Sequence, residues 1–162
     1  MEIKKTDKSD LEGILEIYES ARQYMQEHGN PDQWKNGYPD ENIILMDIEN
    51  GNHYTLVNGV RLLGCFALIE GDDPTYSEIL NGKWLDDSPY AAIHRLAVIE
   101  HGRGIGSICI DWCLVRFRNI RVDTHRDNSS MQRLLNKKEF KYCGVIYTLR
   151  GDERLAFQKV LI

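Results

Sequence analysis

The 162-residue sequence lacks several features that identify common classes of protein. No apolar run approaches the ~18 residues of a membrane-spanning helix, and the first residues are charged rather than a secretory signal. The four cysteines have no metal-site spacing and are expected to be buried free thiols in a reducing compartment. These absences predict a cytoplasmic protein with no metal site and no membrane partner.

The sequence also lacks a positive net charge. Its formal net charge is −5 at pH 7, with 42% hydrophobic and 28% charged residues, an ordinary balance for a globular protein. A broad basic face that binds nucleic acid is therefore not expected. The length is typical of one domain over residues 1–162, and no repeat, linker or low-complexity segment interrupts it.

The most informative stretch is His94–Trp112, which predicts an apolar strand, a short turn and a helix that begins on glycines. Each glycine in the interior of a helix would cost about 1 kcal/mol relative to alanine. At a helix N-terminus the backbone N–H groups have no partner within the helix, and they favour anions. Gly104 and Gly106 lack Cβ atoms, so a phosphate can approach those N–H groups closely.

Spacing excludes two common phosphate loops. No lysine follows Gly106, as a P-loop requires. The glycines at 102, 104 and 106, with Ile108 rather than glycine after them, do not have the Gly-x-Gly-x-x-Gly spacing of a dinucleotide-binding fingerprint. The segment His101–Gly106 instead resembles the pyrophosphate loop of GNAT N-acetyltransferases, Gln/Arg-x-x-Gly-x-Gly/Ala, with histidine at its first position. Residues 122–140 are similar to the family's other cofactor-side motif, with Glu139 in place of its usual glycine.

The expected order of elements is also that of the GNAT fold. This α/β fold is a mixed, mostly antiparallel, twisted sheet of about seven strands, with helices on both faces, splayed at two central parallel strands. Periodicity and turn residues predict strands over 2–6, 53–58, 61–70, 90–98, 120–124, 140–149 and 154–161. Four helices are expected. They are one that begins at the capping box Ser9-x-x-Glu12, one over Asp40–Asn50, one after the glycine loop, and one capped by Asp127-Asn128. Between 71 and 89, one helical turn is expected at Ile79, Leu80 and Trp84.

The resemblance implies direct transfer of an acetyl group from acetyl-CoA to an amine, with no metal and no covalent intermediate. It implies that the N–H groups of Arg103 to Ser107 bind the pyrophosphate and that the pantetheine arm pairs with the main chain of Leu96 and Val98. It also implies that Asn128 contacts the arm. The cofactor-side residues are thus Leu96, Ala97, Val98, His101, Gly102, Arg103, Gly104, Ile105, Gly106, Ser107 and Asn128.

A base must take a proton from the amine, because an ammonium ion cannot attack a thioester. His94 is the first candidate, since strand alternation predicts that it shares a face with Leu96 and Val98. Arylalkylamine acetyltransferases have a functional histidine at the similar point of a His-x-Leu-Ala-Val motif. His125 is the second candidate, and Glu70 or water alone are the remaining alternatives.

The tyrosine with which the family often protonates the leaving thiolate corresponds to Leu135, so the usual acid is missing. Tyr142, Cys143 and Tyr147 are nearby in sequence and are possible substitutes. The resemblance implies that Tyr24, Trp34 and Tyr38 lie in the acceptor-amine pocket, on the side of the splayed strands opposite the cofactor. For Trp34 and Tyr38, in the turn-rich segment 30–39, packing as a hydrophobic lid is the alternative.

Three functions remain open at this point. The first is N-acetylation of a small-molecule or peptide amine by a monomer or homodimer. The second is a degenerate member of the family that binds acetyl-CoA without significant turnover. The third is an interaction protein in which the glycine loop is only a tight turn.

Overall fold

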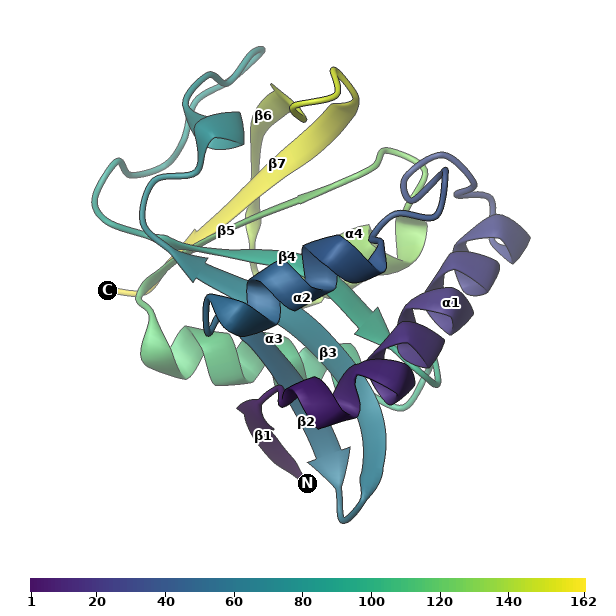
Figure 1. The fold of residues 1–162 in the computed structure, drawn as a ribbon. Helices are drawn as coiled ribbons and strands as arrows, with labels where there is room; N and C mark the ends of the chain where they lie inside the picture. The colour runs from purple at the N-terminus through teal and green to yellow at the C-terminus, as the bar shows by residue number, and fades with distance from the viewer.

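A seven-stranded sheet runs through the computed structural model, which describes residues 1–162 (Figure 1). The strands are β1 (Glu2–Lys5), β2 (His53–Asn58), β3 (Arg61–Glu70), β4 (Ala91–Val98), β5 (Asn119–Thr124), β6 (Lys141–Tyr147) and β7 (Glu153–Val160). Their spatial order is β1-β2-β3-β4-β5-β7-β6, and only β4 and β5 are parallel. This confirms the mixed, mostly antiparallel sheet predicted from the sequence.

Four helices cover the two faces of the sheet. They are α1 (Leu11–Glu27), α2 (Glu41–Glu49), α3 (Ile105–Arg116) and α4 (Ser129–Lys137). On one face, α1 and α2 pack against Cys65 and Ala97, while on the other α3 and α4 pack against Phe66 and Ile93. Cys65 and Phe66 are neighbours in β3, so their side chains point to opposite faces of the sheet. None of the helices is long and apolar enough to cross a membrane.

The start of α1 differs from the prediction. A 3-10 turn, η1 (Lys8–Asp10), precedes the helix and uses the capping groups earlier in the chain. The Asp7 carboxylate accepts the N–H of Ser9 at 3.0 Å, and the Asp10 carboxylate accepts the N–H of Asp7 at 3.1 Å. The predicted box at Ser9 and Glu12 is therefore wrong, because Ser9 is a donor within the extra turn.

The segment between β3 and β4 was also predicted incorrectly. Its only regular element is the 3-10 turn η2 (Pro74–Tyr76), and no helical turn forms at Ile79–Trp84. Leu80 instead forms an isolated β-bridge with Val145, in which each N–H donates to the other's carbonyl at 2.8 Å. Those bonds hold the backbone of Leu80 extended and exclude a helix there.

The two parallel strands separate after a short paired region. Ala91 to Ile93 of β4 pair with Ile120 to Val122 of β5, and pairing between these strands stops there. Beyond that point β4 pairs with β3 alone, and β5 pairs with β7 alone. The predicted splay at the central parallel strands is thus present.

A bulge in β4 lies directly after His94. His94 pairs with Ala67 of β3, whereas Ala97 pairs with Cys65, so two residues of β4 lie opposite one of β3. Arg95 has a φ of 55°, in the left-handed region that a side chain rarely adopts. This is the arrangement of a β-bulge, which inserts one extra residue into one strand of an antiparallel pair.

The extra residue reverses the alternation of side chains along β4. His94 lies on the α1 face together with Ala97, whereas Leu96 and Val98 pack on the α3 face. The prediction that His94 shares a face with Leu96 and Val98 is therefore wrong. Simple alternation holds only for a strand without an insertion.

Candidate active site

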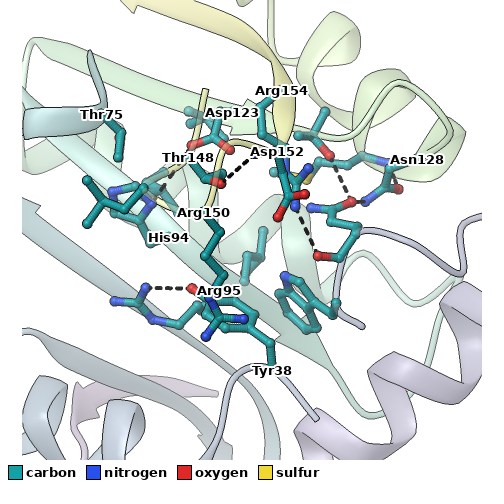
Figure 2. A pocket seen from close by; sticks show the side chains of 18 of the residues that line it. Tyr38, Thr75, His94, Arg95, Asp123, Asn128, Thr148, Arg150, Asp152 and Arg154 are labelled. Atoms are coloured by element: carbon teal, nitrogen blue, oxygen red, sulfur yellow. Dashed lines mark hydrogen bonds and ion pairs between the residues drawn. The ribbon is translucent and has the colours of Figure 1, made fainter. Parts of the chain in front are cut away.

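A cavity of about 360 Å³ opens where β4 and β5 separate (Figure 2). The segment after α1, β4, β5 and the hairpin that joins β6 to β7 all contribute to its walls. This volume lies within the range of ligand pockets, roughly 300–1,000 Å³. Of the residues singled out from the sequence, Trp34, Tyr38, His94, Leu96 and Asn128 line it.

The glycine loop, residues 101–107, leads from β4 into α3. Gly104 is the N-cap of α3 with a φ of 74°, and no side chain caps this helix. The backbone N–H groups of Arg103 to Ser107 donate to no other group of the chain. A Cβ added at Gly104 would meet no atom within 4 Å, so the space beside these donors is open. The loop can therefore bind an anion through its backbone.

Gly106 has a different role from Gly104. A Cβ on Gly106 would lie 3.0 Å from Cδ2 of Leu134 and 3.9 Å from Cδ2 of Leu96. The missing side chain thus allows α3 to approach α4 closely. A substitution at Gly106 would disturb this packing as well as any bound anion.

Tyr24 lies apart from the other two predicted aromatic residues and does not line the cavity. Its ring stacks on that of His101 in the glycine loop, with centroids 3.4 Å apart, and its other neighbour is His28 at 3.8 Å. Its hydroxyl is 3.0 Å from that of Ser130 in α4. Partial burial, together with the charge of His28, lowers the pKa of His101. Tyr24 thus joins α1 to the glycine loop and to α4.

The structure excludes neither of the roles that the sequence left open for Trp34 and Tyr38. Trp34 is buried and packs edge-on against Tyr18 and Tyr38, with centroids 5.7 and 6.4 Å away. Both residues also line the cavity. Lid packing and contact with a ligand are therefore compatible.

His94 is held by a carboxylate on one side. Its Nε2 lies 2.7 Å from Oδ2 of Asp73, whose other oxygen accepts two hydrogen bonds from Thr75. Burial opposes ionisation of Asp73, but the hydrogen bond and charge of His94 outweigh it and lower the Asp73 pKa to about 2. The ionised carboxylate can only accept, so Nε2 of His94 carries a proton. In the neutral ring, the lone pair is therefore on Nδ1.

A second carboxylate faces that lone pair. Oδ2 of Asp123 lies 3.9 Å from Nδ1 of His94 and accepts the hydroxyl proton of Tyr76 at 2.6 Å. Burial, and then the charge of Asp123, raise the pKa of Tyr76 well above its ordinary value, so the phenol keeps its proton. Asp123 is thus placed to stabilise positive charge on His94 or on a bound ammonium.

The bulge that places His94 is fixed by a buried chain of hydrogen bonds. Tyr18 donates its hydroxyl proton to the carbonyl of Arg95 at 2.9 Å, so its oxygen must accept from Nε2 of His53 at 3.0 Å. Nδ1 of His53 then accepts from Thr6 at 2.7 Å. Burial, with the charge of Arg95, lowers the pKa of His53 to about 4, and the ring stays neutral at pH 7.

The side chain of Arg95 is also held by the protein. Its Nε and Nη2 donate to the Asp47 carboxylate at 2.8 and 2.9 Å, and its Nη1 donates to the Tyr38 hydroxyl oxygen at 3.1 Å. This places Tyr38 at the cavity wall and leaves its own hydroxyl proton free to be donated.

The remaining predicted residues lie elsewhere. His125 does not line the cavity, and its Nδ1 accepts the N–H of Asp127 at 3.0 Å, while Glu70 is exposed at the end of β3. Asn128 caps α4 by accepting the N–H of Met131 at 3.0 Å and also lines the cavity. Leu135 is fully buried in the core, and the suggested substitutes for the missing acid, Tyr142, Cys143 and Tyr147, do not reach the cavity.

Several residues of the site were not found from the sequence. Asp73, Asp123 and Arg150 come from three segments and meet only in the fold. Asp73 is in the turn-rich segment before β4, where an acidic residue carries no distinguishing pattern. Asp123 was noted only as part of the motif that begins at Val122.

Comparison with known proteins identifies the family. Neither a family model nor a curated protein sequence matches the chain. The structure of a GNAT-family acetyltransferase from Streptococcus agalactiae 2603 is 34% identical, with a TM-score of 0.88, over 99% of this chain and 95% of that chain. A GNAT-family acetyltransferase from Listeria monocytogenes 4b F2365 is 18% identical, with a TM-score of 0.72, over 99% and 94% of the two chains. The ribosomal-protein-alanine N-acetyltransferase of Brucella melitensis is 17% identical, with a TM-score of 0.63, over 99% and 100%.

The two more distant structures show the shared fold alone. The Streptococcus agalactiae protein is stronger evidence, because a third of the residues are identical over nearly the full length of both chains. Together with the mixed sheet, its splay and the glycine loop, this similarity shows that the chain belongs to the GNAT family of acetyltransferases.

Proposed function

We propose that this protein is an acetyl-CoA-dependent N-acetyltransferase that transfers the acetyl group directly to a primary amine of a small molecule or peptide. The observation that carries the proposal is the position of His94. His94 lines the cavity at the point where β4 leaves β5. Its Nε2 is bound to Asp73, and its Nδ1 makes no hydrogen bond with the protein. This position supports His94 as the base, at a point where an amine could enter.

The residues around the splay fit acetyl-CoA. The open N–H groups of Arg103 to Ser107 are suited to its pyrophosphate. Beyond Ile93, the edge of β4 that faces β5 has no partner strand, which leaves Leu96 and Val98 able to pair with an extended arm. Acetyl-CoA would supply the activated acetyl group as a thioester.

The proton on the amine is the main obstacle to the reaction. An alkyl ammonium resembling that of lysine has a pKa near ~10.4, so at pH 7 the free amine is a minor species. Nδ1 of His94 would take a proton from the amine directly or through water. Asp73 keeps the other ring nitrogen protonated and the ring oriented, and Asp123 would stabilise the imidazolium that forms.

The leaving thiol is less demanding. A thiol with a pKa near ~8.5 leaves as a tolerable thiolate, and water can protonate it afterwards. The burial of Leu135 at the family's tyrosine position is therefore compatible with turnover. It is also the observation that favours the second candidate, a domain that binds acetyl-CoA without significant turnover.

The experiment combines binding with turnover. Acetyl-CoA is titrated into the protein by calorimetry, and CoA release is then followed with a thiol reagent over a panel of primary amines. The four cysteines of the chain are free but buried, so the reagent should give a low background. We expect binding and amine-dependent release. Binding without such release would favour the second candidate, and absence of binding would reject both.

A further inference from the structure

Among the cationic side chains around the cavity, only Arg150 has neither an anionic partner nor a hydrogen bond to the protein. We propose that the acceptor is a free amino acid, with its amine at His94 and its carboxylate bound by Arg150 and the hydroxyl of Tyr38. This inference rests on the proposed function and names the class of amine that the site would take.

The other cations of the cavity are occupied. Arg95 is bound to Asp47 through two hydrogen bonds, and Lys35 pairs with Asp152 at 3.5 Å. The guanidinium of Arg154 is buried and donates to the carbonyls of Gln33 and Glu153 at 3.0 and 2.8 Å. Each of these groups is fixed by the protein itself.

Arg150 differs from them. It lines the cavity from the turn between β6 and β7, and it makes neither an ion pair nor a hydrogen bond with any group of the chain. Its Cζ lies 5.3 Å from the centre of the Tyr38 ring. Figure 2 shows its tip reaching toward Tyr38 and Arg95, away from Asp123. The free guanidinium is a fork of donors that matches the geometry of a carboxylate.

Tyr38 adds a second donor beside this fork. Its hydroxyl oxygen accepts from Arg95, so its own proton remains available. An anion between Arg150 and Tyr38 would therefore receive a charge-assisted hydrogen bond and a neutral one. The ring of Tyr38 also supports the arginine through its face.

The opposite charge gathers around His94. Asp73 and Asp123 both lie within 4 Å of its ring nitrogens, at 2.7 and 3.9 Å, which favours an ammonium there. A ligand with one positive and one negative group satisfies both parts of the cavity. A polyamine would bring a second positive charge to Arg150, and an internal residue of a peptide would bring no carboxylate.

Binding of product-like ligands tests this arrangement without requiring turnover. Calorimetry with CoA present would compare the N-acetyl derivatives of the twenty amino acids with the corresponding N-acetyl amino acid amides. Each pair differs only in the carboxylate. For at least one side chain we expect the acid to bind about tenfold more tightly than its amide, as for a hydrogen bond to a charged group.

Matched variants assign the preference to one residue. Arg150→Gln should remove the difference between acid and amide, and Arg150→Lys should retain part of it. Arg118→Gln is the control, because Arg118 is also an exposed arginine with no side-chain partner but lies outside the cavity. That variant should keep the full preference.

The outcomes separate this inference from the proposed function. If no pair shows a preference for the acid, or if Arg150→Gln keeps it, the carboxylate site is rejected. Acetylation of simple amines and amino acids at equal efficiency would also reject it while leaving the acetyltransferase intact. A preference for the acid that is lost in Arg150→Gln supports the carboxylate site, even if no amine in the panel is acetylated. The absence of acetylation would reject the proposed acetyl transfer instead.

Discussion

The glycine loop and the cavity are built in different ways. The loop presents backbone N–H groups from one continuous segment, Arg103 to Ser107. The cavity presents side chains from separate segments, among them Tyr38, Asp73, His94 and Arg150. A site made of consecutive backbone groups leaves a short pattern in the sequence, whereas a site made of distant side chains leaves none. The glycine loop is therefore the more predictable of the two.

The largest expected effect is a loss of reaction rate on replacing a cavity residue, with no effect on the glycine loop. His94→Ala should lower the rate of amine acetylation by about 100-fold, the lower range for loss of a positioned base, with little change in acetyl-CoA affinity. Steady-state rates and calorimetry would measure the two quantities. His125→Ala is the matched control and should keep its rate. A near-wild-type rate and unchanged pH profile in His94→Ala would assign the base to water or to another group.

Lowering the pH should reduce the unfolding free energy through His53, which belongs to the buried hydrogen-bond chain at the bulge. His53 has a pKa of about 4 in the folded protein, whereas an exposed histidine has one near ~6.5. The unfolded chain therefore binds a proton that the folded chain does not, so stability is full above pH 6.5 and falls as the pH approaches 4.

Between pH 7.5 and 5 this group should cost about 2 kcal/mol of unfolding free energy. Urea unfolding at several pH values would measure it. His53→Gln removes the titrating group and should have a lower but flatter stability over this range. Equal pH dependence in both proteins would contradict the assignment to His53.

The loop is tested by a glycine pair. Gly104 and Gly59 both have a positive φ, 74° and 63°, and both have open space at the Cβ position. Valine at either site should cost roughly 1–2 kcal/mol of stability through backbone strain. Only Gly104→Val should also lower acetyl-CoA affinity, by about tenfold, since one charge-assisted hydrogen bond is lost. Equal affinities in the two variants would move the pyrophosphate site elsewhere.

The smallest effect on rate is expected from restoring the family's tyrosine. Leu135 has no exposed surface and packs in the core with α3, so Leu135→Tyr would place its ring in a filled space. It should lose about 1–3 kcal/mol of stability through overpacking and gain no rate. Melting temperature and turnover would be measured together. A clear rise in turnover would show that thiolate protonation limits the reaction.

The sequence predicted most of the fold because each strand carries its own pattern and because α1 and α4 have clear apolar stripes. It did not predict the bulge at Arg95, since a residue with a positive φ is expected to be glycine. Tyr24 was grouped with Trp34 and Tyr38 by closeness in sequence, but its helix directs it to His101. Asp73 and Arg150 were missed because only the fold brings them to the cavity that His94 lines.

The bulge changes the parity of β4, that is, whether the even-numbered or the odd-numbered residues face α1. Before it, the even-numbered residues face α1, and after it the odd-numbered residue Ala97 does. One strand thereby presents His94 on one side of the sheet and leaves Leu96 and Val98 on the other. Removing Arg95 would restore uniform parity and leave the imidazole on the α1 face, because His94 and Leu96 already face opposite sides and would then be direct neighbours. The extra residue therefore shifts the numbering of the two faces without exchanging them, and its deletion would remove the Arg95 side chain bound to Asp47 and the carbonyl that accepts from Tyr18.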